Sequence, residues 1–170
     1  RTVFNLLGPL VNPLAPEAQV LGVARAELLD PMADALRRLG LQRAVVVHGH
    51  GGMDEASLSG PNQLRLLDGG SVRGEVLDPG ALGLGPAPLE ALRGGDVATN
   101  SAILSAVLRG DGTAAQRDAV ILNTALVLWA AGRTESIASG VAASRRALSD
   151  GAAGQRLDQL RLALPLPCGG

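Results

Sequence analysis

The sequence has no lysine, one cysteine and almost no aromatic residues. All 15 basic residues are arginines, which excludes a lysine nucleophile, a Schiff base or a phosphate-loop lysine from this chain. Cys168 is the single cysteine, so no intramolecular disulfide can form, and a reducing compartment is the simplest interpretation. With one Phe, one Trp and no Tyr, few rings are available for stacking on nucleic-acid bases.

Strong charge and long apolar runs are also missing. The formal net charge is -1, which does not favour binding to nucleic acid or to an anionic membrane. No uninterrupted apolar stretch reaches the roughly 18 residues that a membrane span needs, and the amino terminus lacks the pattern of a signal peptide. We therefore expect a cytoplasmic protein that binds neither nucleic acid nor membranes. Its 170 residues, 46% of them hydrophobic, are enough for one domain with a real core.

The central stretch of the sequence is residues 44–55, Ala-Val-Val-Val-His-Gly-His-Gly-Gly-Met-Asp-Glu. Its β-branched run predicts a strand that is buried on both faces, and its glycines let the backbone turn sharply after the strand. Ligands of open α/β sheets bind at the carboxyl ends of the strands. Asp54 and Glu55 therefore lie where a binding site is expected.

Two adjacent carboxylates suit Mg²⁺, which keeps several waters and takes one or two protein carboxylates together with substrate phosphates. A solvated acidic turn fits the same residues, and the pattern alone favours this simpler interpretation. His48 and His50 are two residues apart and have no cysteine partner nearby, which is not the spacing of a zinc finger. We expect structural or hydrogen-bonding roles for both histidines.

The first half of the chain predicts a sheet. Apolar periodicity and glycine positions indicate a β-α-β unit and then a hairpin whose turn is Gly69-Gly70. The unit comprises a strand at 19–24, a helix at 27–39 and a parallel strand at 41–48. The hairpin strands are expected at 62–67 and 72–77, followed by a connector at 78–88.

The second half is rich in Ala and Leu and predicts helices. Asp96 directly precedes the first of them, where its carboxylate can cap the open amides. The helices are expected at 97–108, 114–131, 134–148 and 152–162. The predicted fold class is therefore α/β, with a mainly parallel central sheet, an antiparallel hairpin at its edge and a cover of carboxy-terminal helices.

Two stretches, in this order, resemble one enzyme family. Residues 1–13 are Arg-Thr-Val-Phe-Asn-Leu-Leu-Gly-Pro-Leu-Val-Asn-Pro, and residues 47–61 are Val-His-Gly-His-Gly-Gly-Met-Asp-Glu-Ala-Ser-Leu-Ser-Gly-Pro. Both are similar to anthranilate phosphoribosyltransferase, which joins anthranilate to phosphoribosyl pyrophosphate in tryptophan biosynthesis. Residues 92–103 and 118–123 also match, so the resemblance covers nearly the whole chain.

The resemblance assigns roles to particular residues. It implies that Asp54 and Glu55 bind the Mg²⁺ that bridges the pyrophosphate leaving group. It places Gly8 beside the anthranilate channel, with Pro9 and Asn5 as neighbours, and it assigns no catalytic residue in this chain. It also implies the nucleoside phosphorylase-like fold and a homodimeric complete enzyme.

Several parts of the family pattern are missing. The Gly-Thr-Gly-Gly-Asp phosphate loop, the arginine that meets the anthranilate carboxylate and the amino-terminal helices of the dimer contact all precede the matched region. We expect residues 1–164 to be the carboxy-terminal part of the α/β domain and residues 165–170 to be a flexible tail. We expect the isolated chain to be inactive, and its own dimerisation is left open.

Two alternatives remain at this stage. A pyrimidine nucleoside phosphorylase shares the architecture, but it has no pyrophosphate to neutralise and so does not need Asp54 and Glu55. A non-catalytic relative that binds nucleic acid would need basic grooves and stacking rings, which this composition does not provide.

Overall fold

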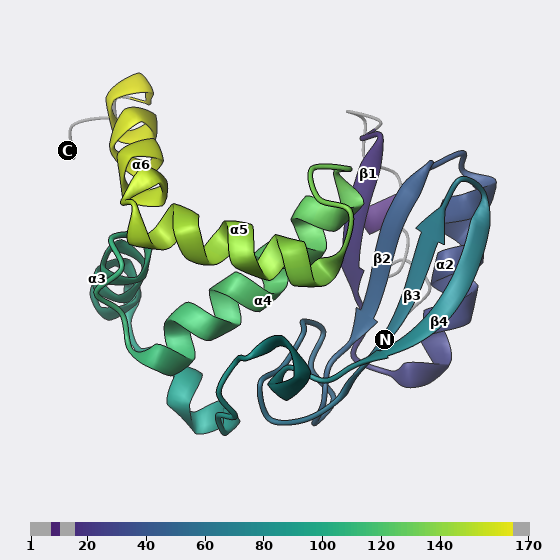
Figure 1. Cartoon of the computed structure of the whole chain (residues 1–170), viewed down its shortest axis with the longest axis horizontal. Coiled ribbons are helices and arrows are strands. Elements are labelled where there is room, and N and C mark those ends of the chain that lie inside the picture. Colours follow the sequence, from purple (N-terminus) through teal and green to yellow (C-terminus); the bar gives the residue numbers. More distant parts are fainter. Residues whose placement is uncertain (1–7, 11–15, 165–170) are drawn as a thin grey trace.

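The computed structural model describes residues 8–10 and 16–164 of the chain. A four-stranded sheet has α2 on one face and α4 on the other (Figure 1). The strands are β1 Ala18–Gly22, β2 Arg43–His48, β3 Asn62–Asp68 and β4 Ser71–Leu77. The α-helices are α2 Leu29–Arg38, α3 Val97–Leu108, α4 Ala114–Ala130, α5 Ile137–Ser149 and α6 Ala152–Ala163. Short 3-10 turns lie at Gly8–Leu10, Ala26–Leu28, Gly80–Leu82 and Leu89–Leu92.

The sheet is mixed, with strand order β1-β2-β3-β4. β1 and β2 are parallel, whereas β2 pairs with β3, and β3 with β4, in antiparallel register. The predicted α/β class and the hairpin edge are confirmed. The parallel part is limited to β1 and β2 among the described strands, because the segment from β2 to β3 contains no crossover helix and β3 returns antiparallel to β2. Gly69 and Gly70 have φ of 56° and 83°, which a tight hairpin turn requires.

Strand β2 lies at the centre of the core. Val45 and Val47 pack in one apolar cluster with α4, while Ala44 and Val46 pack in the other with α2. All four side chains are at most 1% exposed. Full burial of each valine contributes roughly 1.5 to 3 kcal/mol. The prediction of a strand buried on both faces is confirmed, and the strand is a rigid base for the loop that follows it.

The α-helix predicted at 27–39 begins two residues later than expected and ends one residue earlier. The 3-10 turn Ala26–Leu28 comes first, and α2 follows with Pro31 in its first turn, where proline's missing N–H is not needed. Leu29, Met32 and Leu36 point into the core with helical spacing. The predicted strand at 19–24 also shifts, since β1 ends at Gly22.

The carboxy-terminal helices cover the sheet only in part. α4 packs directly on β1 and β2, with Leu122, Leu126 and Trp129 buried against them. α5 packs on α4, and α3 and α6 lie beyond the sheet at the far end of the molecule (Figure 1). Of the helices that were predicted to cover the sheet, α4 is therefore the one that mainly packs on it.

Local capping explains where the helices begin. Asp96 accepts a hydrogen bond from Thr99 N at 2.8 Å, as predicted for the start of α3. α5 begins at Ile137 rather than 134, because Ser136 is its cap and accepts from Ser139 N at 3.1 Å. No helix in the described ranges has both the length and the apolar character that a bilayer span would require.

Candidate metal and substrate site

The loop after β2 turns back over the ends of the central strands. Gly49 N donates to Met53 O at 2.8 Å, and Gly52 N donates to Gly49 O at 3.1 Å. Gly51 and Gly52 have φ of 78° and 84°, in the left-handed region that favours glycine. The glycine run therefore lets the chain reverse its direction after β2. The reversal places Asp54 at the carboxyl end of this strand.

The backbone of the acidic pair packs tightly on two glycines. A Cβ atom on Gly22 would lie 1.5 Å from the carbonyl oxygen of Asp54, and one on Gly49 would lie 1.9 Å from that of Glu55. Both glycines are at the carboxyl ends of parallel strands, and any side chain there would collide with the loop. Asp54 and Glu55 thus lie where the sequence predicted a site.

Gly22 was not identified as a site residue from the sequence. The signal that was available is a glycine near the end of a predicted strand, which often marks the close approach of another backbone segment. The sequence does not say which segment approaches. The structure supplies the partner, Asp54, which is far along the chain from Gly22.

Two asparagine side chains hold the loop. The fully buried Asn62 accepts from Ser57 N at 2.7 Å and from His50 N at 3.3 Å, and it donates to Ser57 O at 3.0 Å. Asn123, on α4, accepts from Ala56 N and donates to Ala56 O, both at 2.9 Å. The segment after Glu55 is thereby fixed to the strand beneath it and to the helix beside it.

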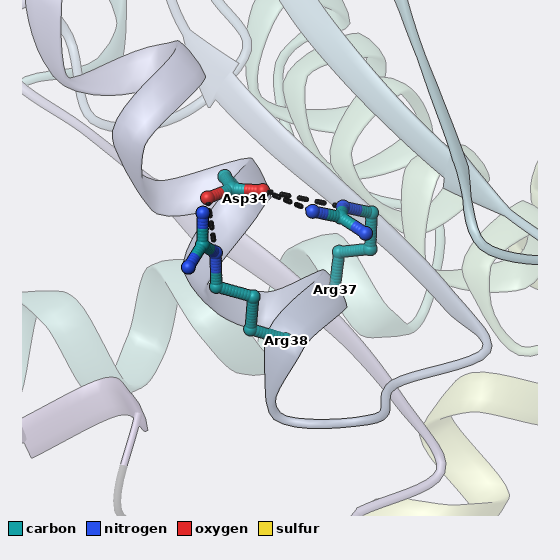
Figure 2. Close-up of polar contacts among 3 residues, drawn as sticks. All are labelled: Asp34, Arg37 and Arg38. Atoms are coloured by element: carbon teal, nitrogen blue, oxygen red, sulfur yellow. Dashed lines mark hydrogen bonds and ion pairs between the residues drawn. The ribbon is translucent and has the colours of Figure 1, made fainter.

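The carboxylates of Asp54 and Glu55 are exposed. Within the described part of the chain, neither forms a hydrogen bond or ion pair with a protein group. Asp34 shows the contrast: Figure 2 shows its carboxylate between Arg37 and Arg38, with the shortest contact to each at 2.6 Å. These hydrogen bonds, that of Arg37 first, lower the pKa of Asp34. The acidic pair instead keeps its oxygens available to a cation.

A hollow of about 380 Å³ lies beside Glu55. Its other walls come from α4 and are mostly apolar; they are Ala119, Val120, Asn123, Thr124 and Val127. Val127 is 51% exposed. A carboxylate at the edge of an apolar wall can hold a charged group on one side while the wall contacts an uncharged one.

Another hollow, of about 570 Å³, lies at the opposite ends of β1 and β2. It is bordered by Ala18 and Arg43, the first residues of these strands, and by Leu10. Arg43 stacks on Trp129 with its guanidinium carbon 4.4 Å from the ring centre. This hollow is separated from the acidic pair by the length of the strands, so it is not part of the same site.

The acidic pair fits a hard cation that is shared with a substrate. No group of three or more His, Cys, Asp and Glu side chains that could enclose a metal is present in the described residues. Two carboxylates leave most positions around Mg²⁺ for water and phosphate oxygens, which is how this ion is usually bound. The chain therefore offers half of a site rather than a closed cage.

The histidines have the structural roles that were expected. His48 Nδ1 lies 2.8 Å from Val23 O and joins the ends of β1 and β2. The ring of His50 lies against Gly60, where a Cβ would come within 2.6 Å of its Nδ1 atom. His48 therefore ties the two strand ends together, while the exposed His50 packs its ring beside Gly60 in the loop.

The predicted anthranilate side of the site is only partly described. Asn5 lies outside the described residues, and Gly8 and Pro9 form the 3-10 turn Gly8–Leu10, in which Gly8 is exposed. Leu10 borders the hollow at the amino ends of the strands. The structure does not bring Leu10 to the acidic pair, and substrate binding by Gly8, Pro9 and Asn5 stays a prediction.

Comparison with known proteins places the chain in a family. Residues 1–154 match the model of the glycosyl transferase family, a/b domain. The chain belongs to this family. The relatives that it matches include the anthranilate phosphoribosyltransferase of Prochlorococcus marinus (strain MIT 9313), which is 66% identical over 164 residues. That match covers 96% of this chain and 47% of the relative.

Solved structures agree with the sequence match. Anthranilate phosphoribosyltransferase from Thermus thermophilus is 45% identical, with a TM-score of 0.86, over 94% of this chain and 46% of that one. The Saccharomyces cerevisiae enzyme in complex with PRPP and Mg is 27% identical, with a TM-score of 0.82, over 93% and 46%. The resemblance found in the sequence is confirmed. The chain spans about half the length of the curated relatives it matches.

Proposed function

We propose that this chain provides the carboxy-terminal half of an anthranilate phosphoribosyltransferase. In it, Asp54 and Glu55 hold the Mg²⁺ that accompanies phosphoribosyl pyrophosphate. One observation carries the proposal: the backbone of the pair is packed on Gly22 and Gly49, while both carboxylates are exposed and free of protein cations in the described residues. The 66% identical relative bears the name of this activity.

The proposed reaction places the anthranilate amine on C1 of the ribose as the bond to pyrophosphate breaks. Positive charge develops on the sugar and negative charge on the leaving group. A bound Mg²⁺ would neutralise the negative charge. Asp54 and Glu55 would hold and orient the metal–pyrophosphate group, and the rigid ends of β1 and β2 would keep it in line with the amine.

The proposal also covers the anthranilate side of the site, the rest of the domain and the state of the complete enzyme. Gly8, Pro9 and Asn5 would border the anthranilate side. Residues 1–164 would complete an α/β domain begun by an amino-terminal half, and residues 165–170 would be a tail. A homodimer in the cytoplasm would be the state of the complete enzyme.

A steady-state assay tests the proposal. We expect no turnover from the 170-residue chain alone, and turnover when it is fused to the amino-terminal half of the Prochlorococcus marinus relative. In that fusion, Asp54→Asn with Glu55→Gln should lower kcat and raise the Mg²⁺ concentration needed for half-maximal rate, with the fold retained. The control is Glu135→Gln, an exposed acid between α4 and α5. An unchanged Mg²⁺ requirement would contradict the proposal and would favour the alternative interpretation, in which Asp54 and Glu55 form a solvated acidic turn.

A further inference from the structure

Asn123 connects helix α4 to the loop of the acidic pair. Its Oδ1 atom accepts from Ala56 N at 2.9 Å, and its Nδ2 atom donates to Ala56 O at 2.9 Å. The same Nδ2 donates to Ala119 O, one turn earlier in α4, at 3.1 Å. Both donor hydrogens are used, so the carboxamide has one orientation that satisfies all three bonds.

The peptide bond between Glu55 and Ala56 is held from both sides. Its N–H donates to Asn123, and its carbonyl oxygen packs where Gly49 lacks a side chain. A peptide unit is planar, so fixing both of its ends fixes the direction in which Glu55 leaves the backbone. The helix therefore sets the position of a side chain that it does not contact by hydrogen bond.

The base of this connection is rigid. Ile121 and Leu122 are 3% and 0% exposed, and Ala125 and Leu126 are fully buried. Asn123 itself is part-buried and borders the hollow beside Glu55. A metal ligand held to about half an ångström needs a supporting group of this kind.

We propose that Asn123 is a positioning residue that fixes Glu55 for the metal by pairing with both backbone groups of Ala56. The inference that Glu55 is positioned for a metal rests on the proposed function. The positioning itself is a property of the loop and can be measured without metal. Some residues orient a metal ligand without binding the metal themselves. Mutating such a residue typically weakens metal affinity by about 10- to 100-fold.

The test compares two alanine variants of the 170-residue chain by NMR. Asn123→Ala removes the three bonds and keeps a good helix former in α4. Asn100→Ala is the matched control, because Asn100 pairs with the N and O of Gly95 at 2.9 and 3.0 Å in the same manner, at the start of α3. Asn123→Asp is a second variant that keeps the acceptor for Ala56 N and loses the donors. The fluorescence of Trp129 reports whether each variant is folded.

Without metal, Asn123→Ala should speed hydrogen exchange of the Ala56 amide by about tenfold and change the amide shifts of Glu55 and Ala56. Asn123→Asp should protect Ala56 N more than alanine does. Asn100→Ala should change Gly95 and leave the loop as it was. Unchanged exchange and shifts in folded Asn123→Ala would overturn the positioning role, whatever the loop binds.

With Mg²⁺, the wild-type chain should show loop shifts that saturate, and Asn123→Ala should raise the Kd about tenfold. In a Glu55→Gln background the same substitution should have little further effect, since Asn123 acts through Glu55. A full additional effect in that background would contradict the inference. Absence of Mg²⁺ binding by the wild type would count against the proposed function, while the exchange result would still decide the role of Asn123.

Discussion

The tight contact between β1 and the acidic loop gives a sharp prediction at Gly22. An alanine there would place its Cβ 1.5 Å from Asp54 O and 2.5 Å from Asp54 C, about 2 Å inside ordinary contact distance. Both contacts are backbone atoms, so no side chain can rotate away. Overpacking of this kind costs about 3 kcal/mol, the upper part of its usual range. For a chain of this size we expect Tm to fall by about 6 to 12 °C.

Gly85→Ala is the matched control for Gly22→Ala. A Cβ on Gly85 would have its nearest neighbour, Asp118 Oδ2, at 3.7 Å, which is ordinary contact. That substitution should leave stability unchanged or raise it by a few tenths of a kcal/mol. Urea unfolding followed by the fluorescence of the single tryptophan, Trp129, measures both. Stabilities of the two variants within about 0.5 kcal/mol of each other would refute the close packing of Asp54 on β1.

Three further substitutions test the core, a helix cap and a surface ion pair. Leu122→Ala, at a side chain that is 0% exposed, should lower unfolding free energy by about 2 to 5 kcal/mol in urea. Thr113→Ala removes the reciprocal cap with Gln116 that begins α4, and calorimetry should show a loss of about 1 kcal/mol. The hydrogen bond from Arg65 lowers the pKa of Asp30, so its stabilisation is present above the unfolded pKa of about 3.9 and is lost as pH falls through the lower folded pKa. Asp30→Asn should remove that part of the acid dependence in urea unfolding between about pH 6 and about pH 2.

The elements that could be predicted from sequence are those with local signals. The β-branched run of β2, the Gly69-Gly70 turn and the Asp96 cap each depend on neighbours within a few residues. The structure confirms all three. The position of the acidic pair at the end of β2 was also predicted from a local signal, because the pair directly follows the β-branched run and its glycine loop.

The parts that could not be predicted depend on contacts between distant residues. Asn123 and Ala56 are 67 positions apart, and nothing near either residue indicates the other. The same holds for the backbone of Asp54 on Gly22. The helices in the second half were expected as a cover for the sheet, but composition does not say that α4 would lie on it and α3 and α6 beyond it (Figure 1).

The most direct test of the metal site is to locate the ion. Mn²⁺, which accepts the same oxygen ligands as Mg²⁺, broadens NMR signals close to it. In a titration of the ¹⁵N-labelled chain, we predict that the amides of residues 54–56 broaden first and that Asp54→Asn with Glu55→Gln abolishes this effect. Broadening centred elsewhere, or equal in the double variant, would contradict the assignment of these two carboxylates as metal ligands.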